Sequence, residues 1–234
     1  MNYSILDASN DFASLSNEIG KYKIKLCKQI KIDFKSQDFR LIALDSIQQY
    51  LLSLTSYIRA FIELQKRVSP DEFLKLLNVG IFTVEEYENS GLIYKFPIES
   101  LATMIHFQID SLFGEIEKQN GTSNTGFYNR MTTILGMINL KRGEKEDIQN
   151  TLQCLAFFRN SFHSNGYHFI HKSKWQNGTE PHVGDLDRSF SQDSHIIEFK
   201  HKEQITYNWK SVYYLVHSSI SSVYTIISNI YSES

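Results

Sequence analysis

The sequence has little proline, little cysteine and no long apolar run. Only 3 prolines and 11 glycines occur in 234 residues, which excludes collagen-like and proline-rich architectures and favours long helices. The two cysteines, Cys27 and Cys154, cannot build a disulfide framework, and we expect two buried thiols in a reducing compartment. Because no apolar run reaches about 18 residues and no secretion signal is visible, we expect a cytoplasmic protein with no membrane span.

Several common catalytic motifs are also missing. The chain has no glycine-rich phosphate loop, Gly-x-Ser-x-Gly, His-Glu-x-x-His or Cys-x-x-Cys pattern, which weakens kinase, serine hydrolase, metalloprotease and zinc-finger interpretations. A formal net charge of −2 argues against a surface that is basic throughout, although it allows a local basic patch. With 41% hydrophobic and 21% charged residues, the composition is that of a folded domain.

Apolar residues recur every three or four positions along most of the chain, which is the period of an amphipathic helix. The clearest stripe predicts a helix over 39–67, ended by Ser69-Pro70. Weaker stripes predict further helices over about 12–26, 97–119, 125–140, 144–164 and 208–231. Alternation at 30–34 favours an extended segment, and 79–97 looks irregular.

Residues 167–206 break the helical period. Within them, 167–171 and 195–201 are short apolar stretches of the kind that form strands, and a polar segment with glycine and proline separates them. We therefore predict an all-α helical bundle, one domain over 1–234, with a β-hairpin insertion at 167–206 before the C-terminal helix.

Two polar residues fall where the core face of the 144–164 helix is expected. Its apolar stripe passes through 148, 152 and 155, and four-residue steps lead to Arg159 and His163. A buried arginine needs a partner carboxylate or a water-filled cleft, because an unpaired buried charge is very costly. Arginine offers a fork of donors to a phosphate, and histidine titrates near neutral pH. The alternative is structural: an ion pair for Arg159 and capped carbonyls for His163.

The segment Arg159-Asn160-Ser161-Phe162-His163-Ser164-Asn165-Gly166 resembles the Arg-Asn…His motif of the HEPN superfamily, and is similar to a bacterial group with an Arg-Asn-Ser-x-His-x-Asn-Gly segment. HEPN proteins are helical bundles of prokaryotic defence, toxin–antitoxin and RNA-processing systems. The spacing between Arg159 and His163 is shorter than the family's usual one. The resemblance implies a HEPN-like fold, a homodimer whose Arg and His come from two protomers, an RNA substrate, and an antitoxin or defence-system partner.

The resemblance also implies roles for single residues in a metal-independent endoribonuclease. Arg159 would bind the scissile phosphate, Asn160 would orient the motif or contact the substrate, and His163 would be the general acid or base. Attack by the ribose 2′-hydroxyl would give a 2′,3′-cyclic phosphate without metal or cofactor, and would restrict cleavage to RNA. Other members place an acidic residue on an earlier helix near the motif; Asp110 is the candidate here, and Asp45 a weaker one.

Other features leave alternatives open. Six of the eight histidines fall within 163–201, but their spacing matches no zinc pattern, so we predict no metal. A run of lysines could contact an RNA backbone, although a solvated face is the favoured interpretation: Lys21, Lys23, Lys25, Lys28, Lys31 and Lys35. The alternatives to a nuclease are a non-catalytic interaction or dimerisation module and a protein that binds a nucleotide or a small phosphorylated ligand.

Overall fold

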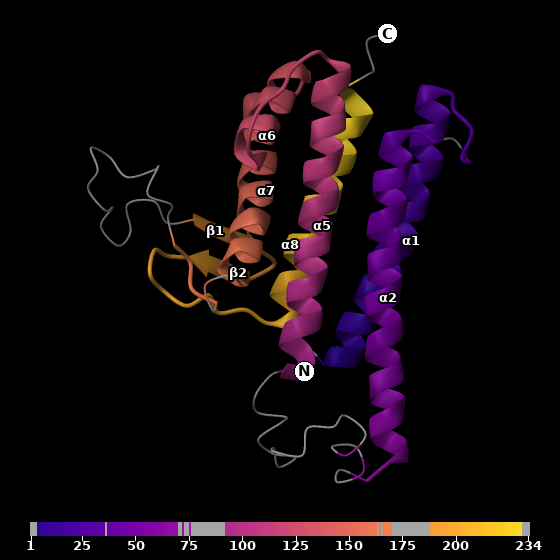
Figure 1. The fold of residues 1–234 in the computed structure, drawn as a ribbon, viewed down its shortest axis with the longest axis vertical. Coiled ribbons are helices and arrows are strands. Elements are labelled where there is room, and N and C mark those ends of the chain that lie inside the picture. Colours follow the sequence, from indigo (N-terminus) through magenta and orange to yellow (C-terminus); the bar gives the residue numbers. More distant parts are fainter. Residues whose placement is uncertain are drawn as a thin grey trace.

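The computed structural model describes residues 4–35, 37–69, 72, 75, 92–162, 164, 166–169 and 188–230. Within these ranges the chain forms six helices and one two-stranded antiparallel sheet, as Figure 1 shows. The helices are α1 (Ile5–Ile30), α2 (Phe39–Arg67), α5 (Leu92–Gln119), α6 (Phe127–Met137), α7 (Arg142–Phe162) and α8 (Trp209–Asn229), and the strands are β1 (Arg188–Gln192) and β2 (His195–Phe199). The mostly helical fold with a hairpin before the C-terminal helix is confirmed.

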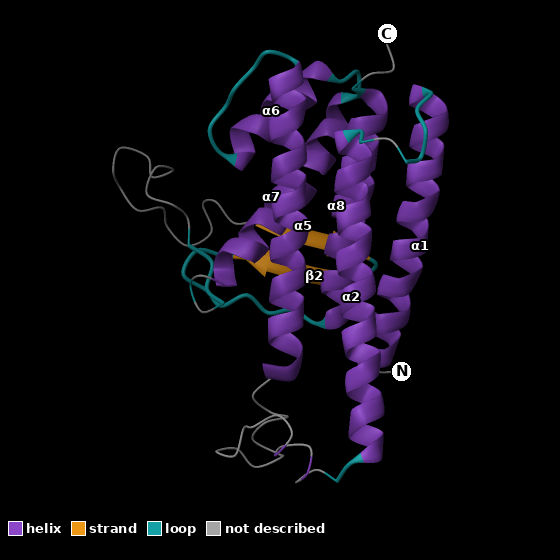
Figure 2. Cartoon of the chain, turned by 45° about the vertical axis from the view of Figure 1, so that its right-hand side comes forward, coloured by secondary structure: helices purple, strands orange, loops and turns teal. Residues whose placement is uncertain are grey.

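The long helices lie side by side and share one core. Helix α2 packs between α1 and α5, while α8 packs against α1, α5 and α7 (Figure 1). The short helix α6 packs on α5 and α7, and the hairpin lies against α7 and α8 (Figure 2). The end of α7 that carries Arg159 lies against α5, where Arg159 contacts Phe107, and α6 packs on α5 nearby through Phe127.

The apolar stripes that predicted the helices form the core. On α2, Leu44, Ile47 and Leu51 are fully buried, and on α5 so are Ile105 and Ile109. Complete burial of each such side chain stabilises the fold by about 1.5–3 kcal/mol relative to exposure. On α7 the inward line runs from Leu155 to Phe158, so Arg159 lies beside the core line rather than on it. A helix turns once per 3.6 residues, so either Phe158 or Arg159 could follow Leu155 on the same face. The apolar Phe158 takes the buried position.

Helix bounds agree with the sequence in some places and differ in others. Helix α2 has the predicted bounds, and α8 begins after its N-cap, Asn208, whose side chain accepts a hydrogen bond from the Ser211 backbone. Helix α1 continues through Ile30 and ends where Lys31 adopts a left-handed conformation, so the extended segment predicted from residue 30 was wrong at its start. Helix α5 begins at Leu92, five residues before the predicted start at Pro97, so Pro97 lies inside the helix and cannot donate a backbone hydrogen bond there. Residues 79–91 lie outside the described part of the chain.

The hairpin contains one of the two predicted strands: β2 lies within the predicted 195–201 stretch, whereas its partner β1 was not predicted. Strand β1 pairs with β2 through a turn at Asp193 and Ser194, both with positive φ, and the buried Phe190 and Ile197 stand opposite one another. The predicted strand over 167–171 was wrong where it is described: Tyr167 makes an isolated bridge to Gln204, while 170–171 lie outside the described residues. The turn lacks the glycine that marks most tight hairpins, which explains the wrong prediction.

No helix among the described residues is long and apolar enough to cross a membrane. This agrees with the absence of a long apolar run in the sequence.

Candidate functional site

The predicted motif lies where helix α7 ends. Arg159 is in the last turn of the helix, whose final residue is Phe162; His163 and Asn165 lie outside the described residues. The chain leaves the helix through Gly166, whose N–H donates to the Ser161 carbonyl at 2.9 Å. The φ of Gly166 is +87°, which favours glycine, and this agrees with the prediction that Asn165-Gly166 ends the helix.

Arg159 is half-buried and has a positive charge that no described carboxylate neutralises. Its guanidinium carbon lies 5.3 Å from the ring centre of Phe107 on α5, and its Nη1 donates to the side-chain oxygen of Asn160 at 2.8 Å. The Nε atom is buried and has no hydrogen-bond partner. Among the described residues Arg159 forms no ion pair, which disfavours a purely structural salt bridge. Asn160 is exposed and holds the guanidinium from one side.

Asp110 binds a different arginine from the one we expected. Its Oδ1 accepts from Arg130 Nη1 of helix α6 at 2.8 Å. Arg130 is also shared with Glu117, whose Oε2 lies 3.6 Å from Arg130 Nε and whose side chain is almost completely buried. Asp110 therefore belongs to an α5–α6 network, and the sequence prediction that it reaches Arg159 did not take Arg130 into account. A catalytic role for Asp110 stays a prediction.

Asp45 lies in a separate ion pair. Its Oδ1 accepts from Lys23 Nζ at 2.5 Å, and Lys23 is only 6% exposed. The expectation of a solvated lysine face was therefore wrong for Lys23, which packs inward with its Nζ over the ring of Phe34. The other lysines of the run are exposed: Lys21, Lys25, Lys28, Lys31 and Lys35.

His106 of helix α5 is the residue that sequence reasoning missed. The side chain is 8% exposed, its ring centre lies 4.5 Å from that of Phe127 on α6, and its Nδ1 is buried without a hydrogen-bond partner. Burial, reinforced by the charge of Arg159 and opposed by Asp110, lowers the pKa of His106 to about 4. His106 is therefore uncharged at neutral pH. The four-residue spacing between His106 and Asp110 is the signal that could have found it, because it places both on one face of α5.

Across the described ranges, no three histidine, cysteine or acidic side chains come together in a way that could hold a metal ion. His168 packs against Phe157 with ring centres 4.8 Å apart, and His171 and His182 are not described. Cys154 is buried, which raises the pKa of its thiol to about 12 and keeps it protonated.

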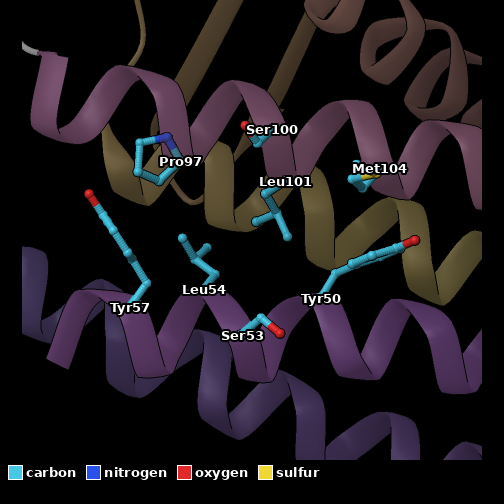
Figure 3. A pocket seen from close by; sticks show the side chains of 8 residues that line it. All are labelled: Tyr50, Ser53, Leu54, Tyr57, Pro97, Ser100, Leu101 and Met104. Atoms are coloured by element: carbon cyan, nitrogen blue, oxygen red, sulfur yellow. The ribbon is translucent and has the colours of Figure 1, made fainter. Parts of the chain in front are cut away.

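An apolar cleft lies between α2 and α5, close to Phe107 along α5. It has a volume of about 230 Å³, and Figure 3 shows Tyr50 and Tyr57 of α2 at its two ends. The remaining lining residues are Ser53, Leu54, Pro97, Ser100, Leu101 and Met104. None of the lining residues is charged, so the cleft offers packing rather than acid–base chemistry. Met104 lies three residues before Phe107 and both are exposed, so an apolar strip on α5 joins the cleft to Arg159.

The arrangement around Arg159 is suited to an anion. A cation without a carboxylate, an exposed amide and an uncharged imidazole gather where α7 meets α5, and an arginine fork matches phosphate oxygens. Comparisons with protein-family models, with curated proteins and with solved structures give no match to this chain.

Proposed function

We propose that this protein is a metal-independent endoribonuclease of a prokaryotic defence or toxin–antitoxin system. The observation that carries the proposal is Arg159, a half-buried guanidinium at the end of α7 that pairs with no described carboxylate. Burying a cation in this way is unfavourable unless an anion completes its surroundings, and a phosphate of RNA is such an anion. The resemblance of 159–166 to the HEPN motif supports the same reaction.

In the proposed reaction the substrate supplies its own nucleophile. The ribose 2′-hydroxyl loses a proton to a general base and attacks the neighbouring phosphorus, and the bond from phosphorus to the 5′-oxygen breaks. Arg159 and Asn160 bind the phosphate oxygens on which negative charge increases. His163 either takes the proton of the 2′-hydroxyl as general base or gives a proton to the departing 5′-oxygen as general acid, and water takes the other of these two roles. The products are a 2′,3′-cyclic phosphate and a free 5′-hydroxyl.

The proposal includes a homodimer, as the resemblance implies. The surface next to Arg159 supports it, because Phe107 and Met104 of α5 are exposed apolar side chains beside the motif. A second copy that covered them would exclude water from the site and strengthen its electrostatic interactions.

The test is RNA cleavage in the presence of EDTA. Purified protein is incubated with total RNA, beside Arg159→Ala and His163→Ala variants and an Arg142→Ala control on the same helix. Arg142 is 93% exposed and, among the residues that the structure describes, pairs with Glu146, so we expect its loss to leave the site intact. We expect EDTA-resistant cleavage with 2′,3′-cyclic phosphate ends, lowered at least about a hundredfold by the first two substitutions. Intact RNA with the unaltered protein would contradict the proposal.

A non-catalytic interaction module is the second candidate, and the cleft favours it. Tyr57, Met104 and Phe107 expose apolar surface on and beside the cleft, as partner-binding surfaces do. Under this candidate RNA stays intact, which separates it from the nuclease. Met104→Glu changes the sedimentation behaviour of the protein under either candidate, because both use this apolar surface.

A further inference from the structure

His106 and Arg159 share one environment although they come from different helices. Both contact Phe107, whose ring centre lies 6.5 Å from that of His106 and 5.3 Å from the guanidinium carbon of Arg159. Each also has one buried nitrogen with no hydrogen-bond partner, Nδ1 of His106 and Nε of Arg159. Buried polar atoms without partners are rare in proteins and are found at sites that bind or react.

We propose that His106 and Arg159 together form the site for one RNA phosphodiester, and that the bound phosphodiester brings a proton onto the His106 imidazole. This inference rests on the proposed function, since it takes the phosphate at Arg159 as given. It adds a second binding residue and a proton that is taken up on binding.

The coupling follows from the charged groups that face His106. Arg159 of α7 disfavours the imidazolium, Asp110 of α5 favours it, and Arg130 of α6 reduces the effect of Asp110 by pairing with it. A phosphodiester at Arg159 cancels the repulsion from the guanidinium and attracts the imidazolium directly. The bound anion therefore stabilises protonated His106, and protonation of His106 strengthens binding by the same factor.

The pKa of His106, about 4 in the free protein, sets the range in which the effect is measured. If the bound anion raises this pKa by about one to two units, affinity rises about two- to tenfold between about pH 7 and about pH 5. A phosphodiester keeps a single charge throughout this range, so the change comes from the protein.

The experiment measures binding without cleavage. A short 2′-O-methyl oligouridylate is the probe, because its uracils do not titrate in this range and it has no free 2′-hydroxyl. Affinities are measured by calorimetry at both pH values in a His163→Gln background, which removes the other histidine of the motif. His106→Gln is compared with His217→Gln, a control on α8 whose imidazole pairs with Glu18.

We expect Arg159→Ala to weaken binding of the oligouridylate. We expect the lower pH to strengthen binding in the His163→Gln protein and in its His217→Gln variant, but not in its His106→Gln variant. Should His106→Gln unfold, His106→Phe replaces it and keeps a ring against Phe127. A second measurement needs no substitution at His106: calorimetry of the His163→Gln protein in buffers of different ionisation enthalpy gives the number of protons taken up on binding. An equal pH effect in the His106 variants, no pH effect at all, or binding that Arg159→Ala leaves unchanged would each overturn the inference. EDTA-resistant cleavage that depends on Arg159 would still leave the proposed nuclease standing.

Discussion

We predict that Arg159→Met leaves the free energy of unfolding nearly unchanged, whereas Arg130→Met lowers it strongly. The two arginines differ in their partners: Arg159 has an amide and an aromatic ring, while Arg130 has Asp110 and the buried Glu117. Removing one cation from a buried ion pair leaves an uncompensated charge, whereas removing an unpaired cation does not.

The magnitudes come from these contacts. Arg159→Met loses a cation–π contact of about 0.5–1 kcal/mol and a hydrogen bond of about 0.5–1.5 kcal/mol. It also removes the buried Nε, whose missing hydrogen bond costs about 1–3 kcal/mol, so the midpoints of the loss and the gain nearly cancel. Arg130→Met breaks a pair of the kind worth about 3–5 kcal/mol when fully buried, and we expect about 2–3 kcal/mol because Arg130 is 28% exposed.

Urea unfolding at neutral pH, followed by circular dichroism, measures both changes. The unaltered protein and Arg142→Met, an exposed arginine on α7, are the references. If Arg159→Met lost as much stability as Arg130→Met, Arg159 would be part of the scaffold, and the reasoning that assigns it to an anion would be refuted.

Three further predictions concern single residues. The pKa of His106 is about 4 in the folded protein and near its ordinary 6.5 when unfolded. The free energy of unfolding therefore falls by up to about 3 kcal/mol as the pH drops from 6.5 to 4. Urea unfolding of His106→Gln should lack that part of the loss. Cys154 should react with a maleimide reagent at least about tenfold more slowly than Cys27 at pH 8, since burial raises its thiol pKa to about 12; equal rates in mass spectra would contradict its burial. Asn208→Ala should lower stability by about 1 kcal/mol in urea unfolding, because the Ser211 N–H loses its acceptor; an unchanged midpoint would count against the cap.

The helices could be predicted from the sequence because burial imposes its own period. A row of apolar residues such as Leu44, Ile47 and Leu51 is stable only when buried in the core. The row therefore predicted α2 with its observed bounds. Helix ends and strand partners were harder, since they depend on single hydrogen bonds and turns. Pro97 looked like a helix start but lies inside α5, and the turn at Asp193 has no glycine to mark it.

The candidate site was predicted only in part. Asn165-Gly166 placed Arg159 near the end of α7, whereas the apolar stripe wrongly placed it on the core line. Which acid pairs with which arginine depends on how α5, α6 and α7 meet. His106 was missed for the same reason. Its lowered pKa and its packing depend on Arg159 and Phe127, which lie on other helices.

The pairing of Asp110 with Arg130 has a consequence for Arg159. Asp110 and Arg159 both act on His106, so the carboxylate and the second guanidinium belong to one neighbourhood. Arg130 holds Asp110 by a hydrogen bond, so in the proposed reaction this carboxylate does not compete with the RNA phosphate for the guanidinium of Arg159. Under the proposed function, helix α6 thus keeps an internal competitor away from the phosphate site at Arg159, and loss of Arg130 would free Asp110 to compete for that guanidinium.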